Sequence, residues 1–321
     1  MAVSNRPGNQ PARRAAKPAR RWLKASAMAG GGLVALAVGA TGALWWWAGT
    51  EGSLATGLQW ASQSQPLKFE NATGSLRAGG HIDQLHWQQD GVNANARDVT
   101  LAWQPWSLLQ GTLKLKRLAA ASIQVTDERP PSPTPTLPPN ALGLPLQVAL
   151  DDFFVGHFEF RGKAAFTVAD IAGNYAYNGL RHQLDLKSTQ YASGRYSGRA
   201  VLTSAGPLTL DATLSGALAV TVPNHPEPVP LTFQATASGP LTEMQVKAEL
   251  QMTAAAKAPA ADAKKPAAQP HASASARVMP WAAQPLPQAD ATFRDLDLAA
   301  LLPQAPQTLL TGSASVRPLE S

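Results

Sequence analysis

LTLDATLSG occupies residues 208–216, and LTFQATASG follows 23 residues later at residues 231–239. In each copy apolar residues alternate with polar ones, and a glycine ends the segment. Alternation with a period of two is typical of a β-strand, because successive side chains point to opposite faces. Two similar units one hairpin apart favour a sheet that grows by adding strands, although chance similarity is common in a sequence rich in threonine and alanine.

The same alternation extends toward the N-terminus. Val92 and Ala94 alternate with asparagines, and Val99 and Leu101 alternate with Thr100 and Ala102. Asp90-Gly91 lies just before them, and this dipeptide suits a tight hairpin because it tolerates positive φ. The predicted fold is mainly β: a single N-terminal transmembrane helix, followed by an extended, curled antiparallel sheet with repeat-like strands.

Composition divides the chain into segments. Proline can neither donate to a β-ladder nor sit inside a helix, so the proline-rich stretch is expected to be an exposed loop, and an Ala/Lys/Pro tract cannot bury enough surface to fold. A short helix is expected near Leu54–Trp60, where apolar residues share one side. The expected segments are 1–24 (basic tail), 25–50 (anchor), 51–128 (first β region), 129–145 (proline-rich loop), 146–253 (second β region), 254–276 (disordered insertion) and 277–321 (start of a further β region in a truncated chain).

The anchor prediction rests on charge. Residues 25–50 carry no charged side chain, and seven Lys or Arg precede them without one acid. As a helix this stretch would reach about 39 Å, enough to cross a hydrocarbon core. The positive-inside bias then keeps the N-terminus in the cytoplasm and exports the rest. The residues assigned to the anchor and its interfaces are Arg20, Arg21, Lys24, Leu33, Leu36, Trp45, Trp46 and Trp47.

A cleaved secretory signal is the alternative, because it also has a basic start and an apolar middle. Cleavage after Ala43 would leave three tryptophans at a new N-terminus, whereas a belt at the lipid headgroups explains them. Both readings export the remainder. Of 27 Lys and Arg, 20 lie beyond the anchor against all 21 acidic residues, so the exported part gives no reason to expect nucleic-acid binding. The chain has no cysteine and therefore no disulfide.

No constellation of residues indicates an enzyme, a cofactor or a metal. The six histidines show no ligand spacing and are expected to be solvated at the surface. Asp151 and Asp152 are adjacent in a predicted strand, so their side chains point to opposite faces and cannot share an acid/base site.

The order of these segments resembles a family. The runs 67–74, 82–87, 92–103 and 113–125, with the segment 293–303 followed by Thr311-Gly312, are similar to the N-terminal region of TamB, the inner-membrane subunit of the translocation and assembly module in the AsmA-like group. The resemblance implies a single-pass inner-membrane protein whose bulk lies in the periplasm. It also implies an outer-membrane partner of the TamA type, met through a C-terminal region that this sequence lacks.

The resemblance further implies an apolar β groove that carries phospholipid acyl chains or assists outer-membrane protein and autotransporter assembly. Alternating strands supply such a face. An ordinary sandwich core is the alternative assignment for the same residues, and an exported structural or binding β-protein is the alternative function. The residues expected to line the groove are Val92, Ala94, Val99, Leu101, Leu210, Leu214, Phe233, Val246 and Leu250.

Overall fold

The computed structural model describes residues 42–130, 137–162, 165–220, 229–252, 271–296 and 310–317. The chain divides into two compact units after Trp47. In the first, Trp45–Trp47 belong to a helical turn at 42–47, and the other predicted anchor residues (Arg20, Arg21, Lys24, Leu33 and Leu36) lie outside the described ranges. Within those ranges, no helix combines the length and the apolar character that a membrane crossing requires.

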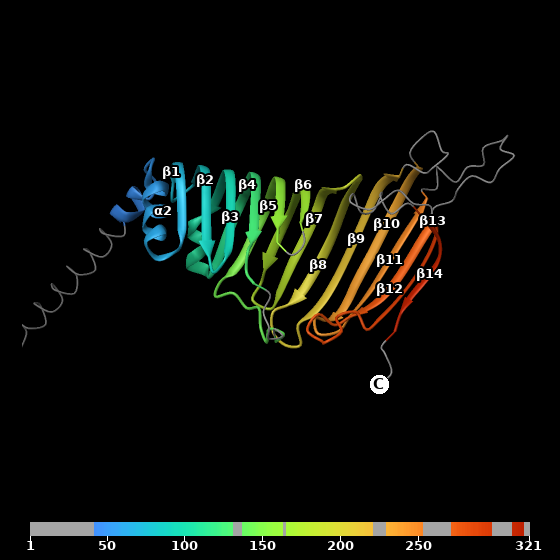
Figure 1. Ribbon diagram of the computed structural model, residues 1–321. Coiled ribbons are helices and arrows are strands. Elements are labelled where there is room, and N and C mark those ends of the chain that lie inside the picture. The colour runs from blue at the N-terminus through green and yellow to red at the C-terminus, as the bar shows by residue number, and fades with distance from the viewer. Residues whose placement is uncertain are drawn as a thin grey trace, which may run out of the picture. The chain divides into compact units, whose positions relative to one another are not determined.

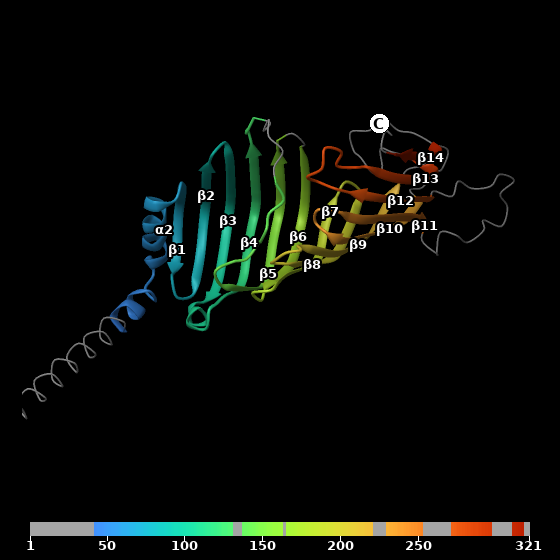
Figure 2. The same cartoon turned by 90° about the horizontal axis from the view of Figure 1, so that it is seen from below.

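The second unit is one 14-stranded sheet whose strands follow each other in sequence order (Figures 1 and 2). A helix, α2 (Ser53–Ser64), precedes β1. The first elements are β1 (Leu67–Ser75), β2 (Gly79–Gln89), β3 (Val92–Gln104), the 3₁₀ helix η1 (Pro105–Gln110) and β4 (Thr112–Asp127). Asp90 and Gly91 join β2 to β3 with φ of 49° and 80°, which confirms the predicted hairpin turn.

The middle of the sheet contains one exception to the predicted antiparallel order. β5 (Gln147–Arg161) pairs with β4 in parallel, Thr112 opposite Gln147. Parallel neighbours need a connection that returns along the full strand, about 50 Å for 16 residues. The proline-rich segment supplies it. The next strands, β6 (Phe166–Tyr177), β7 (Arg181–Tyr191) and β8 (Gly194–Thr203), are antiparallel again.

The last strands contain the two similar sequence units. They are β9 (Thr209–Val220), β10 (Val229–Pro240), β11 (Met244–Met252), β12 (His271–Val278), β13 (Gln288–Leu296) and β14 (Leu310–Val316). The prediction of disorder through residue 276 was wrong at its end, because β12 already begins at His271. Alternating small residues from Ala272 to Ala276 pair with β11 and β13. The rest of that insertion lies outside the described residues.

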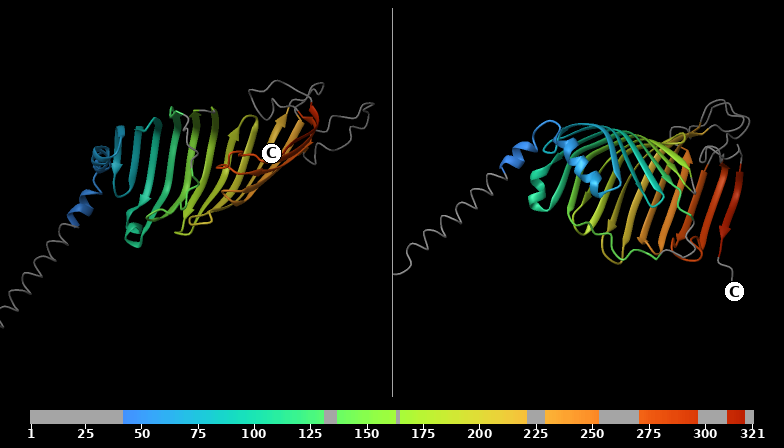
Figure 3. Two further views of the ribbon diagram at one scale, coloured as in Figure 1. Left: turned by 60° about the horizontal axis from the view of Figure 1, so that its bottom comes forward. Right: turned by 60° about the vertical axis from the view of Figure 1, so that its left-hand side comes forward.

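The sheet is a single layer that twists and curls (Figure 3). All described strands belong to it, so the alternative of a sandwich core was wrong. A small core forms where α2 covers one face near β1. There Leu54 packs with Ile82, Val99 and Ala120, and all four are buried. Burial of this apolar stripe, rather than helix propensity, holds α2 in place, since its sequence contains no charge and no side-chain cap.

Candidate functional site

All nine predicted groove residues lie on the same face of the sheet. Residues directly opposite each other in neighbouring strands share a face, so the face can be followed from strand to strand. We call it the apolar face. One row of partners crosses it from β1 to β14 without a polar side chain: Gly74, Gly80, Leu101, Leu118, Phe153, Gly173, Leu186, Gly198, Leu214, Ala235, Ala248, Ala274, Ala291 and Ala314.

A change of phase inside β3 keeps this face continuous. Strict alternation would put Ala94 and Val99 on opposite faces, because five residues separate them. Asp98 adopts a positive φ of 52°, and the pairing of β2 with β3 omits Asp83 and Asp98 without a shift of register. The alternation is reversed on the two sides of this interruption. Asn71 in β1 and Asp170 in β6 also have positive φ, and both lie in the row of partners that contains Asp98. The alternation of side chains is therefore reversed at the same level in several strands.

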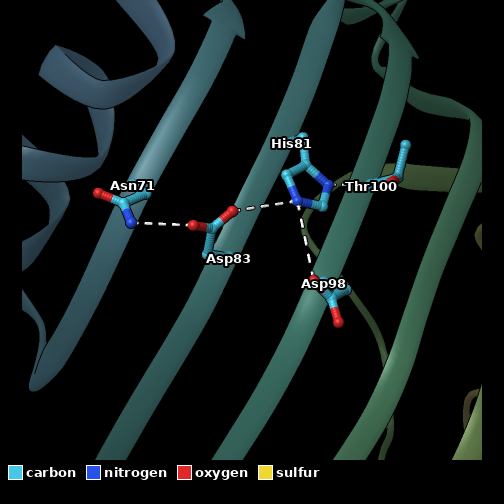
Figure 4. Close-up of polar contacts among 5 residues, drawn as sticks. All are labelled: Asn71, His81, Asp83, Asp98 and Thr100. Carbon is cyan, nitrogen blue, oxygen red and sulfur yellow. Dashed lines mark hydrogen bonds and ion pairs between the residues drawn. The ribbon is translucent and has the colours of Figure 1, made fainter.

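Polar side chains at and beside the interruption at Asp98 lie together on the face opposite the apolar face (Figure 4). The Asn71 amide donates to Asp83 at 2.9 Å, and His81 Nε2 lies 3.2 Å from the same carboxylate. His81 Nδ1 lies 3.4 Å from the Thr100 hydroxyl. About half of the Asp83 side chain is exposed (50%), so the cluster is solvated, as expected for His81.

The apolar face is hollow where it is built from small residues. A cavity of about 320 Å³ opens over β7–β11, at the lower end of the size range of ligand pockets. We call it the trough. Glycine and alanine on three neighbouring strands leave the space, and larger aliphatic side chains flank it. These residues are Gly198, Ala200, Ala212, Ala235 and Ala237 on the floor, with Leu184, Leu186, Leu214 and Val246 at the sides.

Aromatic rings lie beside the trough toward one strand end. Tyr196 packs edge-on against Phe233, with ring centroids 5.9 Å apart, and Phe233 is opposite Leu250 in β11. Burial raises the pKa of Tyr196 above its ordinary value, with a smaller contribution from Tyr191. A surface made of aromatic and aliphatic side chains favours apolar ligands over charged ones.

The predicted groove residues therefore divide into groups. Leu214 and Val246 line the trough, while Phe233 and Leu250 pair near its aromatic end and Leu210 continues the same face toward the other strand end. Val92, Ala94 and Leu101 lie on the apolar face in β3. Val99 is buried in the core around Leu54, so α2 rather than open space covers it.

Several trough residues were not predicted from the sequence. Leu184 and Leu186 alternate with polar residues as clearly as Leu210 and Leu214 do, so the same pattern could have identified them. Gly198 and Ala200 were missed because small residues give a weak hydrophobic pattern. Gly173 is a further small residue of the apolar face; it lies inside β6, where the Cβ of any other residue would meet the Asp185 carbonyl oxygen.

His182 departs from the expected solvated histidines. Its ring stacks on Tyr177, with centroids 4.5 Å apart, and its Nδ1 lies 2.7 Å from the Tyr175 hydroxyl. Its Nε2 lies 2.9 Å from the carbonyl oxygen of Leu142 in the connection between β4 and β5. Burial is the main cause that raises the pKa of Tyr175. The cluster attaches this connection to β6 and β7.

The trough is suited to binding rather than to acid/base chemistry. Among the described residues that line it, Arg199 alone is charged, and its guanidinium lies 3.5 Å from Asp185 on the opposite face. Asp152, half exposed, lies 3.1 Å from Lys187. In the part of the chain that the structure describes, no three carboxylates, histidines or cysteines gather as a metal site would require.

Comparison with known proteins identifies the first part of this architecture. Residues 40–142, which span α2, β1–β4 and the start of the following connection, match the family model described as TamB, N-terminal domain. No curated protein and no solved structure matches the chain. Residues 40–142 are therefore similar to the N-terminal domain of TamB.

Proposed function

We propose that this chain is an inner-membrane-anchored, non-enzymatic protein of outer-membrane biogenesis, which shelters phospholipid acyl chains on its apolar face. The observation that carries the proposal is the row of partners without one polar side chain from β1 to β14. The TamB N-terminal domain supports a TamB-like role in outer-membrane assembly. In this proposal the bulk of the chain lies in the periplasm, and a TamA-type partner would be met outside this sequence.

The energetics of acyl chains support a continuous face. Exposing one CH₂ group to water costs about 0.8 kcal/mol, so an acyl chain of sixteen carbons would cost on the order of 12 kcal/mol to carry unshielded. An apolar surface that continues from strand to strand removes most of that cost at every position. In this proposal the acyl chain lies in the trough over β7–β11, between the larger side chains that flank it.

Photocrosslinking tests which face meets lipid. Crosslinkers at Leu101, Leu210, Phe233 and Val246 are expected to capture phospholipid in cells. The matched positions Thr100, Asp211, Gln234 and Lys247 are the next residues along each strand and lie on the opposite face. They should capture little. Equal capture from both faces would contradict the proposal, as would lipid capture from neither.

The anchor is tested at the N-terminus. We expect the mature protein to retain residues 1–50, because seven cations and the tryptophans Trp45–Trp47 suit a retained helix better than a cleaved signal. N-terminal sequencing of protein purified from membranes checks this. A sequence that begins near Leu44 would instead favour an exported structural or binding β-protein.

A further inference from the structure

We propose that the strand ends around η1 form a second membrane contact, which rests against an anionic lipid surface. We call this surface the η1 end; it comprises the turns at 75–78, 105–111, 144–146 and 178–180. The proposal rests on the proposed function only through the anchor. It concerns a surface rather than the trough, so the two can fail separately.

Exposed apolar side chains gather at the η1 end. Trp106 is 60% exposed, Leu109 80% and Leu180 74%, and Leu108, Leu144 and Leu146 are exposed as well. The turns are neighbours in space: the Gln147 amide donates to the Gly111 carbonyl at 3.0 Å, and Val148 is opposite Tyr177. A tryptophan beside leucines is the composition of membrane-interface segments.

The other end of the same strands is different. Its described turns, 90–91, 128–130, 162 and 192–193, contain none of the exposed large apolar side chains. Two cations there pair with acids two residues away: Arg129 lies 2.7 Å from Asp127 and Arg161 lies 2.6 Å from Glu159. Phe166, the first residue of β6, is 41% exposed at this end, and Arg195 forms no ion pair with a described residue. The larger number of exposed apolar side chains, rather than charge alone, therefore distinguishes the η1 end.

Charge at the η1 end suits anionic headgroups. Lys114 and Arg181 lie within three residues of the apolar turns, and neither forms an ion pair with any described residue. Arg77 is also exposed there. Among the described residues Glu51 is the one acid beside these turns, whereas Asp151 and Asp152 lie further along β5. Apolar residues with an excess of cations fit a lipid surface better than an uncharged protein partner.

The first residue of the second unit is hydrogen-bonded to the η1 end. Ala48 directly follows Trp47, and its carbonyl accepts from the Arg77 amide at 2.9 Å. The Trp103 indole then donates to the Leu76 carbonyl at 2.8 Å, which joins the turn at 75–78 to the strand that leads into η1. The segment at which the second unit begins is therefore held at the η1 end.

Spin labels test the contact in the full chain, which contains no cysteine of its own. Leu109→Cys carries the label at the η1 end, and Glu128→Cys carries it at an exposed site on the other end. In nanodiscs that contain phosphatidylglycerol, we expect collisions with a water-soluble nickel reagent to be about tenfold fewer at residue 109, as for a side chain inserted at an interface. Lys114→Gln with Arg181→Gln should raise those collisions about fivefold or more, and Arg129→Gln should not.

The outcomes separate the contact from the anchor. A label at residue 109 that is as accessible as one at residue 128 overturns the proposal. Dipolar broadening between labels also overturns it, because a second copy would then cover the surface. A chain that does not enter nanodiscs contradicts the anchor instead, and adding phosphatidylglycerol vesicles to that chain still tests the contact through the same two labels.

Discussion

Leu214→Arg is expected to abolish phospholipid transfer while leaving the anchor inserted. Leu214 belongs to the apolar row and lines the trough, next to Gly198 in β8 and Ala235 in β10. An arginine there would fill the hollow and place a charge against acyl chains, a penalty of several kcal/mol. Since each 1.4 kcal/mol is a factor of ten, transfer between donor and acceptor vesicles should fall about a hundredfold or more.

Ser215→Arg is the matched control. Ser215 is the next residue in β9, is exposed, and lies on the opposite face, where its hydroxyl is 3.4 Å from that of Ser197. It introduces the same charge into the same strand without touching the trough. Comparable loss of transfer in both variants, or unchanged transfer in Leu214→Arg, would show that acyl chains do not pass over β9.

The strands and the hairpin turns were accessible from sequence because they are local. Asp90 and Gly91 both tolerate positive φ, and the alternation on either side fixes the two strands of the hairpin. The same period gave the face of each groove residue within its own run, but it would have put Ala94 and Val99 on opposite faces. Curvature, the parallel step from β4 to β5 and the absence of a second layer depend on contacts between distant segments, which a period of two does not encode.

The change of phase at Asp98 lies between these cases. Arg97 and Asp98 are two consecutive polar residues in an alternating run, and aspartate tolerates the left-handed region better than most residues. That local signal was present and could have placed a change of phase. Its alignment with Asn71 and Asp170 could not have been found without the register, because it depends on how β1, β3 and β6 pair through the strands between them.

Leu54→Asp is expected to release α2 from the sheet. Leu54 is 5% exposed and packs with Ile82, Val99 and Ala120. The substitution removes the central apolar contact of α2 and buries a carboxylate without a partner, at a cost of about 3–5 kcal/mol. This is a large share of the roughly 5–15 kcal/mol that stabilises a typical domain. Gln59→Asp, on the exposed side of the same helix, should cost little.

The loss of stability in Leu54→Asp should remain local, because each strand in a single-layer sheet contacts only its neighbours, as in repeat proteins. Amide hydrogen exchange should accelerate in α2 and β1–β3 and stay unchanged in β9–β11, whose buried residues Leu218, Leu231 and Leu250 lie far along the sheet. Global unfolding of the variant would mean that the sheet folds as one cooperative unit. Unchanged exchange in α2 would mean that the packing around Leu54 does not hold the helix, and α2 would then lose its role as the cover over Val99.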